Sequence, residues 1–229
     1  MKKIYTIILL FSLFSFSTRE ATMQKTNLPP GFVYLTDYIP DLKLDLRYAS
    51  SHNFVGRPII GYKKKVCIVT ESCAKKLQKI NKELKKYDLA ILIYDAYRPQ
   101  KAVNDFLLWA RDTQDTLMKK EFYPYIPKKE LFKRGFIASK SRHSSGSTVD
   151  ITLYSLKYNA VLDMGSTYDY FGVKSYVNYE KLNKEQKYNR QFLQKVMHEH
   201  GFRSYYKEWW HFTLRNEPYA NHYFNFDVN

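Results

Sequence analysis

The sequence predicts one domain of the α+β class, which begins near residue 32 and runs to the end of the chain. Two amphipathic helical patterns, and a continuous apolar run of strand length between them, carry this prediction. Neither an internal repeat nor a linker divides the region. With 45% apolar and 17% aromatic residues among 229, the composition excludes a disordered or collagenous protein.

The first twenty residues predict a secretory signal peptide, over about residues 1–20. Lys2 and Lys3 precede an apolar run from Ile4 to Phe16. This run is shorter than the roughly 20 residues that span a bilayer as a helix. An uncleaved N-terminal anchor stays open as an alternative, because Ser15 to Thr18 matches the small-x-small cleavage pattern poorly. We expect an exported protein, periplasmic or in the cell envelope, without stable membrane insertion once the signal is cleaved.

Residues 21–31 read as a polar linker that ends in Pro-Pro-Gly. The first helix is predicted over Cys73 to Lys86, where apolar residues recur every three or four positions with lysines between them. The apolar run from Leu89 to Tyr94 predicts a buried central strand. Pro99 then opens a second helix, since proline suits the start of a helix.

The C-terminal half adds two short strands and a further helix. The strands are predicted over Val149 to Tyr154 and His211 to Leu214. The helix is predicted to run from Asn189, as its N-cap, to His200, and to end before Gly201.

Two cysteines, Cys67 and Cys73, lie six residues apart, the first in a predicted strand and the second in the first turn of the next helix. Export to an oxidising compartment permits a disulfide between them, and a pair of buried free thiols stays open as the alternative. Metal ligation by this pair is disfavoured, because no further cysteine and no nearby histidine completes a site.

The chain is strongly basic, with 37 Lys plus Arg against 22 Asp plus Glu and a formal net charge of +15. A charge of this size makes nucleic acid, anionic membranes and acidic polymers candidate partners. The lysines are scattered around helices, however, and accompany no recognised nucleic-acid motif. Together with the export signal, this pattern predicts that the protein does not bind nucleic acid.

Two of the six histidines occur beside acidic residues at the entrances to predicted strands. His143 lies in a polar, glycine-containing loop that leads to Asp150, and His211 ends the segment Glu-Trp-Trp-His that begins at Glu208. Two imidazoles and a carboxylate are a known ligand set for catalytic zinc, and a further carboxylate is what a zinc hydrolase needs as general base. A single histidine of this kind is more often only hydrogen-bonded, so the combination carries the hypothesis.

Four separated motifs and the N-terminal region resemble the D-alanyl-D-alanine dipeptidases, which are VanX-like zinc peptidases. The motifs are Tyr94 to Pro99, Ser141-x-His143-x-x-Gly146-x-x-x-Asp150, Leu162 to Gly165 followed by Asp169, and Glu208 to His211; the N-terminal region comprises Asp37 to Asp41, Asp45 to Ala49 and Asn53-Phe54. The resemblance covers essentially the whole mature chain. It implies a Hedgehog/DD-peptidase-like fold, with a mostly antiparallel central sheet and flanking helices, and a zinc D,D-dipeptidase domain over residues 32–229.

Carried over residue by residue, the resemblance implies one Zn²⁺ per chain, bound by His143, Asp150 and His211. It implies that Glu208 is the catalytic base and that Arg98 lies near the scissile carbonyl. Two substrate contacts are also implied: Asp169 pairs with the free amino group of the substrate, and Ser141 helps to hold its C-terminal carboxylate. The expected substrate is the small molecule D-Ala-D-Ala, hydrolysed in the envelope during cell-wall turnover or scavenging.

One geometric demand follows from the spacing of these residues. Residues at i and i+3 of a regular strand lie on opposite faces, so Glu208 and His211 can share one site only if a turn or a bulge separates them.

Several alternatives stay open at this stage. Arg98 has a structural alternative as the ion-pair partner of Asp95, and Asp169 has one as a plain loop acid. The alternative enzyme is a D,D- or L,D-carboxypeptidase of the same fold that acts on peptidoglycan stem peptides. A catalytically silent envelope-binding module would require a missing ligand, yet the sequence retains the full set. The sequence gives no oligomeric state.

Overall fold

The computed structural model describes residues 28–229, and the predicted signal peptide and most of the predicted linker lie outside this range. Its central sheet has six strands, five of them in the order β2-β4-β5-β8-β7, with β6 paired to β5. Only the β2–β4 pair is parallel, so the expected mostly antiparallel sheet is confirmed. The strands are β2 (Lys43–Leu44), β4 (Leu89–Asp95), β5 (Thr148–Ser155), β6 (Ala160–Val161), β7 (Phe202–Tyr205) and β8 (Glu208–Leu214).

A second, two-stranded antiparallel sheet and four α-helices complete the main elements. This sheet pairs β1 (Phe32–Tyr34) with β3 (Ile68–Thr70). The α-helices are α1 (Glu71–Leu84), α2 (Gln100–Arg111), α3 (Lys119–Phe122) and α4 (Lys184–Glu199). Short 3₁₀ helices are η1 (Leu35–Asp37), η2 (Arg47–Ala49), η3 (Lys85–Tyr87), η4 (Lys128–Glu130), η5 (Arg142–Ser145) and η6 (Val173–Ser175).

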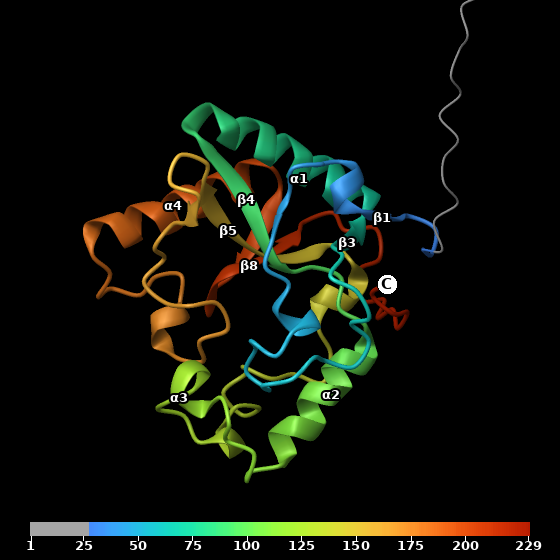
Figure 1. The fold of residues 1–229 in the computed structure, drawn as a ribbon, viewed down its shortest axis with the longest axis vertical. Coiled ribbons are helices and arrows are strands. Elements are labelled where there is room, and N and C mark those ends of the chain that lie inside the picture. The colour runs from blue at the N-terminus through green and yellow to red at the C-terminus, as the bar shows by residue number, and fades with distance from the viewer. Residues whose placement is uncertain (1–27) are drawn as a thin grey trace, which may run out of the picture.

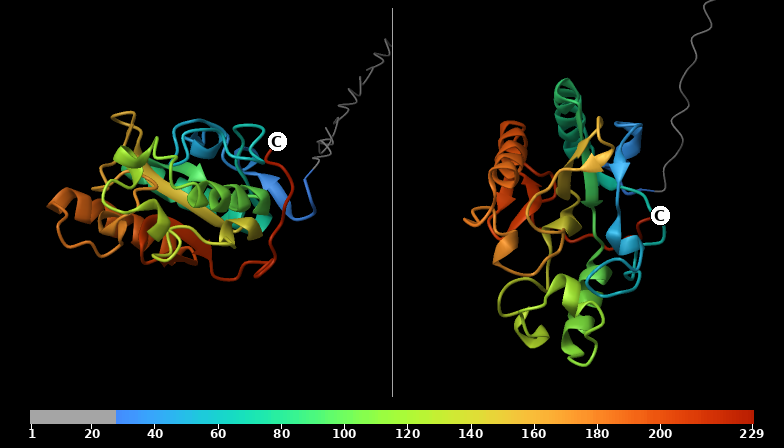
Figure 2. Two further views of the ribbon diagram at one scale, coloured as in Figure 1. Left: turned by 90° about the horizontal axis from the view of Figure 1, so that it is seen from below. Right: turned by 60° about the vertical axis from the view of Figure 1, so that its left-hand side comes forward.

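The sheet separates an apolar core from a polar face. On β5, Val149, Ile151 and Leu153 point to one face and are fully buried in the main core, as strand alternation requires. Helices α1 and α4 lie along one side of β4, β5 and β8, whereas α2 and α3 form the opposite end of the molecule (Figure 1). The turned views show the same separation (Figure 2). The alternate β5 residues, Asp150 among them, are therefore left for a polar site.

The predicted elements are found, with α1 shifted by two residues, β8 starting three residues earlier and the largest boundary error at the start of α4. The N-cap of α4 is Asn183, six residues before the predicted one, and its side chain accepts from the Gln186 N–H in a capping box. Asn189 instead lies inside the helix, buried, and donates to the Asp163 carbonyl. The first turn of α4 carries polar residues, so the apolar period shows only the buried part of the helix.

Both cysteines are buried free thiols, which decides between the two alternatives for them. Burial raises the pKa of both thiols, so neither is poised to react as a thiolate. Within residues 28–229, no helix is long and apolar enough to cross a membrane.

Candidate metal centre and active site

Three predicted ligands converge on one point of the polar face of the sheet. His143 Nε2 lies 3.2 Å from Asp150 Oδ1, and His211 Nδ1 lies 3.1 Å from the same oxygen. The two imidazole nitrogens are 3.3 Å apart. His143 and Asp150 are almost completely buried, whereas the side chain of His211 is 17% exposed. One ligand atom from each residue thus forms a nearly equilateral triangle that opens on one side to solvent.

This triangle has the dimensions of a zinc site. Tetrahedral zinc with bonds of about 2.0–2.1 Å holds neighbouring ligand atoms about 3.3–3.4 Å apart. Asp150 Oδ1 is buried and has no hydrogen-bond donor among the described residues, as expected for an oxygen that binds a cation. The two imidazoles hold the pKa of Asp150 well below its usual range against the opposing effect of burial, so the carboxylate is available as a charged ligand. These residues fit a divalent zinc ion.

The loop before β5 fixes the ring of His143. Ser141 caps η5 by accepting from the His143 N–H at 3.3 Å. The His143 Nδ1 donates to the Ala96 carbonyl at 2.7 Å, which leaves Nε2 as the free lone pair. Gly146 ends η5 at a φ of 80°, and a Cβ there would lie 2.2 Å from the ring of Phe32. A side chain at position 146 would therefore displace the loop that carries His143.

Two β-bulges turn acidic residues toward the site. Asp150 and His211 face each other across the β5–β8 pair. Between β7 and β8 the register passes from Ser204↔Phe212 to Tyr205↔Glu208, so β8 has three extra residues. The bulge that the sequence demanded is therefore present, and it lets Glu208 and His211 share one site. A second bulge, between Ile93 and Asp95 of β4, brings Asp95 opposite Asp150.

Glu208 lies beside the metal triangle. Its Oε2 is 3.4 Å from His211 Nδ1, and 18% of its side chain is exposed. Burial raises the pKa of Glu208 to about 7, and the negative charge of Asp150 adds to this while the positive charges of His211 and Arg98 oppose it. A carboxyl group with a pKa near the working pH is suited to accept a proton and to release it again.

Arg98 forms the ion pair that the sequence left open and also lines the cavity. Its guanidinium pairs with Asp95 at 2.7 Å, which is the structural alternative, and lies 3.6 Å from Asp150. The Tyr62 hydroxyl donates to the other Asp95 oxygen at 2.6 Å. The Arg98 side chain is 12% exposed and lines the pocket, so the ion pair holds a fixed positive charge beside the ligand triangle.

Asp169 is a buried acid and not a plain loop residue. Only 6% of its surface is exposed, and it adopts a left-handed backbone with a φ of 58°. The Tyr48 hydroxyl donates to its Oδ2 at 2.8 Å. Burial, reinforced by the charge of Asp150, raises the pKa of Asp169 well above its usual range. Such a carboxyl is stabilised by a cation, so it favours a positively charged ligand group in the pocket.

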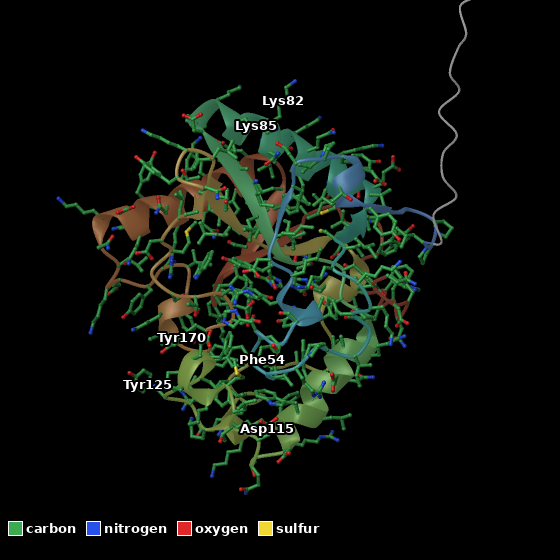
Figure 3. All side chains as sticks on the ribbon, viewed as in Figure 1. Phe54, Lys82, Lys85, Asp115, Tyr125 and Tyr170 are labelled. Carbon is green, nitrogen blue, oxygen red and sulfur yellow. The ribbon has the colours of Figure 1, made fainter. Side chains whose placement is uncertain are left out.

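The site residues border one cavity of about 370 Å³. Phe54 lines this cavity and is buried. Its label in Figure 3 lies between the sheet and the end of the molecule formed by α2 and α3. Among the residues that line it are all seven predicted site residues: Arg98, Ser141, His143, Asp150, Asp169, Glu208 and His211. The structure therefore brings together every one of them.

Sequence reasoning assigned no role to two tyrosines that contact the acids of this site. The Tyr168 hydroxyl donates to Asp150 Oδ2 at 3.0 Å, and Tyr48 binds Asp169 as described. The sequence could have indicated Tyr168, because it directly precedes Asp169, the acid that follows the Leu162 to Gly165 motif. The contact of Tyr48 joins residues 121 positions apart, and no local pattern contains it.

A largely buried His-Asp-His triangle with an adjacent carboxyl of raised pKa, on the polar face of a mixed sheet, defines the class of single-metal hydrolases. The family model of the D-Ala-D-Ala dipeptidases, peptidase family M15, matches residues 29–229. The chain belongs to this family and is an enzyme of the peptidase class. The resemblance seen in the motifs is confirmed.

Three curated relatives carry the name D-alanyl-D-alanine dipeptidase. The protein from Enterococcus faecalis is 38% identical over 87% of this chain and 98% of its own length. The one from Enterococcus faecium is 37% identical over 86% of this chain and 98% of its own length. The one from Streptomyces coelicolor is 34% identical over 86% of this chain and 98% of its own length.

A solved structure of a mutant of the vancomycin resistance D,D-pentapeptidase VanY, in complex with Zn(II), also matches. It is 12% identical, with a TM-score of 0.40 over 69% of this chain and 78% of that chain.

We predict that Glu208→Gln stabilises the metal-free protein more at pH 8 than at pH 5. The folded-state pKa of about 7 lies above the ordinary value of 4.5, so the cost of burying the carboxylate grows as the pH rises from about 4.5 to about 7, is complete above pH 7 and is small near pH 5. Partial exposure reduces the full linkage effect, and we expect about 2 kcal/mol at pH 8. Urea denaturation after chelation measures it, with the exposed Glu180→Gln as control. Equal effects at both pH values would refute the raised pKa.

Proposed function

We propose that this enzyme hydrolyses the dipeptide D-Ala-D-Ala to two D-alanines with one bound zinc ion. The observation that carries the proposal is the triangle of His143, Asp150 and His211 beside Glu208, in a cavity that also contains the buried acid Asp169. The names of the relatives support the substrate, because the matches extend over nearly their whole length. The cavity volume of about 370 Å³ supports a substrate of dipeptide size.

The three ligand residues would hold the zinc ion, which when bound polarises a carbonyl and lowers the pKa of water. Glu208 takes a proton from the attacking water at its carboxylate and passes it to the nitrogen of the leaving amine. In the metal-free protein its pKa is about 7, near neutrality, which suits a group that both accepts and releases a proton.

Arg98 stabilises the negative charge that develops on the scissile carbonyl oxygen. Its guanidinium is permanently charged, and the bond to Asp95 holds it in place before the reaction starts. A preorganised charge of this kind favours the transition state over the neutral ground state.

Two further residues select the ends of the substrate. Asp169 accepts a hydrogen bond from the free ammonium group of the substrate, and a peptide extended at its N-terminus would leave this acid unpaired. Ser141, at the pocket wall, donates to the C-terminal carboxylate. The alternative function, a carboxypeptidase for peptidoglycan stems, has no use for an ammonium partner at Asp169.

We further propose that the enzyme acts outside the cytoplasm, periplasmic or in the cell envelope, where it scavenges dipeptide from cell-wall turnover. The support is the predicted signal at residues 1–20. The net charge of +15 favours proximity to an anionic envelope, and Lys82 of α1 and Lys85 of η3 lie at the end of the molecule far from Phe54 (Figure 3). Apart from the substrate, we propose no partner and no binding of nucleic acid.

Removal of the metal is expected to abolish turnover, and zinc to restore it. Glu208→Gln is expected to keep one zinc per chain and to lose at least a thousandfold in kcat, because it removes the proton acceptor and leaves the ligands in place. Metal analysis and D-alanine release measure the two effects, with Glu180→Gln as matched control. Activity in Glu208→Gln would refute its role as base.

Cleavage of D-Ala-D-Ala is expected to exceed that of a pentapeptide stem by orders of magnitude in kcat/KM. Asp169→Asn is expected to reduce this preference, since it removes the charge that requires a free amine. Comparable cleavage of the stem by the unmodified enzyme would favour the carboxypeptidase.

The full chain, expressed in a Gram-negative host, is expected in the envelope fraction, and a variant without residues 1–20 in the cytoplasm. Immunodetection after osmotic shock distinguishes them. Retention of the full chain in the cytoplasm would overturn the proposed location.

A further inference from the structure

Glu217 is a buried carboxylate that pairs with two arginines of the active-site cavity and has no role in the proposed chemistry. Its side chain is 2% exposed. One of its oxygens lies 2.6 Å from the Arg142 guanidinium and 3.7 Å from that of Arg203. The Ser145 hydroxyl donates to the other oxygen at 2.5 Å. Glu217 is therefore enclosed by its partners and anchors two arginines to one point.

The charge of this group is unbalanced. Two guanidinium groups share one carboxylate, so one positive charge remains uncompensated. Both arginines line the cavity, and their side chains are 46% and 47% exposed, so the uncompensated charge is at the cavity rim. Lys140 lines the same cavity and adds to the positive charge. The rim is thus preorganised to receive an anion.

The backbone places this charge close to the metal triangle. Arg142 directly precedes the ligand His143 in η5. Arg203 lies opposite Thr213 in the β7–β8 pair, and Thr213 follows the ligand His211 by two residues on the same face of the strand. Two residues of a strand span about 7 Å and neighbouring strands lie about 5 Å apart, so the Cα of Arg203 is about 8–9 Å from that of His211, close to the length of an arginine side chain. Arg203 is therefore near enough to contact the part of a substrate that lies just beyond the scissile amide.

Resting on the proposed function, we propose that Arg142 and Arg203, held by Glu217, form an anion subsite that binds a carboxylate of the substrate on the C-terminal side of the scissile bond. The dipeptide ends in a carboxylate, and a neutral hydroxyl such as that of Ser141 does not offset its charge, whereas a guanidinium does. The carboxylate has two possible sources, the C-terminal group or an acidic side chain on the second residue. The second source would extend the substrates to dipeptides such as D-Ala-D-Glu.

Two pairs of dipeptides distinguish these sources. The first pair, D-Ala-D-Ala and its C-terminal amide, differs in the charge of the C-terminal group. The second pair, D-Ala-D-Glu and D-Ala-D-Gln, differs in the charge of the side chain. We expect Arg203→Gln to raise KM about tenfold for the charged member of at least one pair, with kcat and the neutral member unchanged. The affected pair identifies the source. Arg203→Lys, which keeps the charge, is expected to restore most of the binding, and Arg111→Gln, an exposed arginine at the end of α2, serves as control.

Arg203→Gln is the informative variant, because it leaves the shorter Arg142–Glu217 ion pair intact. Equal KM values in both members of each pair, or equal losses in all four dipeptides, would overturn the subsite. Calorimetric titration of Glu208→Gln protein with the same four dipeptides reads the subsite without turnover. If the unmodified enzyme hydrolyses none of them, the proposed function fails, and the calorimetric dependence on Arg203 still decides the subsite.

Discussion

The active site depends on one energetic constraint, the burial of the Asp150 carboxylate on the central strand β5. A charge with 2% exposure is tolerated only where other charges and hydrogen bonds compensate it. Two imidazoles, the guanidinium of Arg98 and the hydroxyl of Tyr168 lie around it. The same arrangement leaves Oδ1 without a donor, so compensation is complete only when a cation joins the triangle. Fold and metal affinity are coupled through this residue.

The sheet meets this constraint by irregularity at two points. A regular β4 would direct Asp95 to the apolar core, and a regular β8 would direct Glu208 away from His211. Each bulge sends one acid to the polar face while the neighbouring residues keep the core intact. The bulge in β8 was predictable, because a regular strand would place Glu208 and His211 on opposite faces. The bulge in β4 was not predictable, since it leaves the apolar run of the sequence uninterrupted.

The class of fold, the central strand and the seven residues that meet in the cavity were predictable, because each rests on a local pattern or on a motif. The start of α4 was not, since its first turn has no buried side chain and the apolar period is silent there. Contacts between distant segments were also beyond local patterns. The hydrogen bond from Ser145 to Glu217 joins residues 72 positions apart, and nothing near Glu217 in the sequence indicates that it is buried.

The net charge of the chain has a different meaning at the surface and in the cavity. Lysines on α1 lie in solvent, where salt screens them. The cavity contains groups of both signs: Asp169 is a buried acid that favours a cation, and the arginines on Glu217 favour an anion. A free dipeptide carries both charges, one at each end. Under the proposed function these two groups would disfavour longer peptides without any steric block, because an extension at either end would remove the charged partner of one of them.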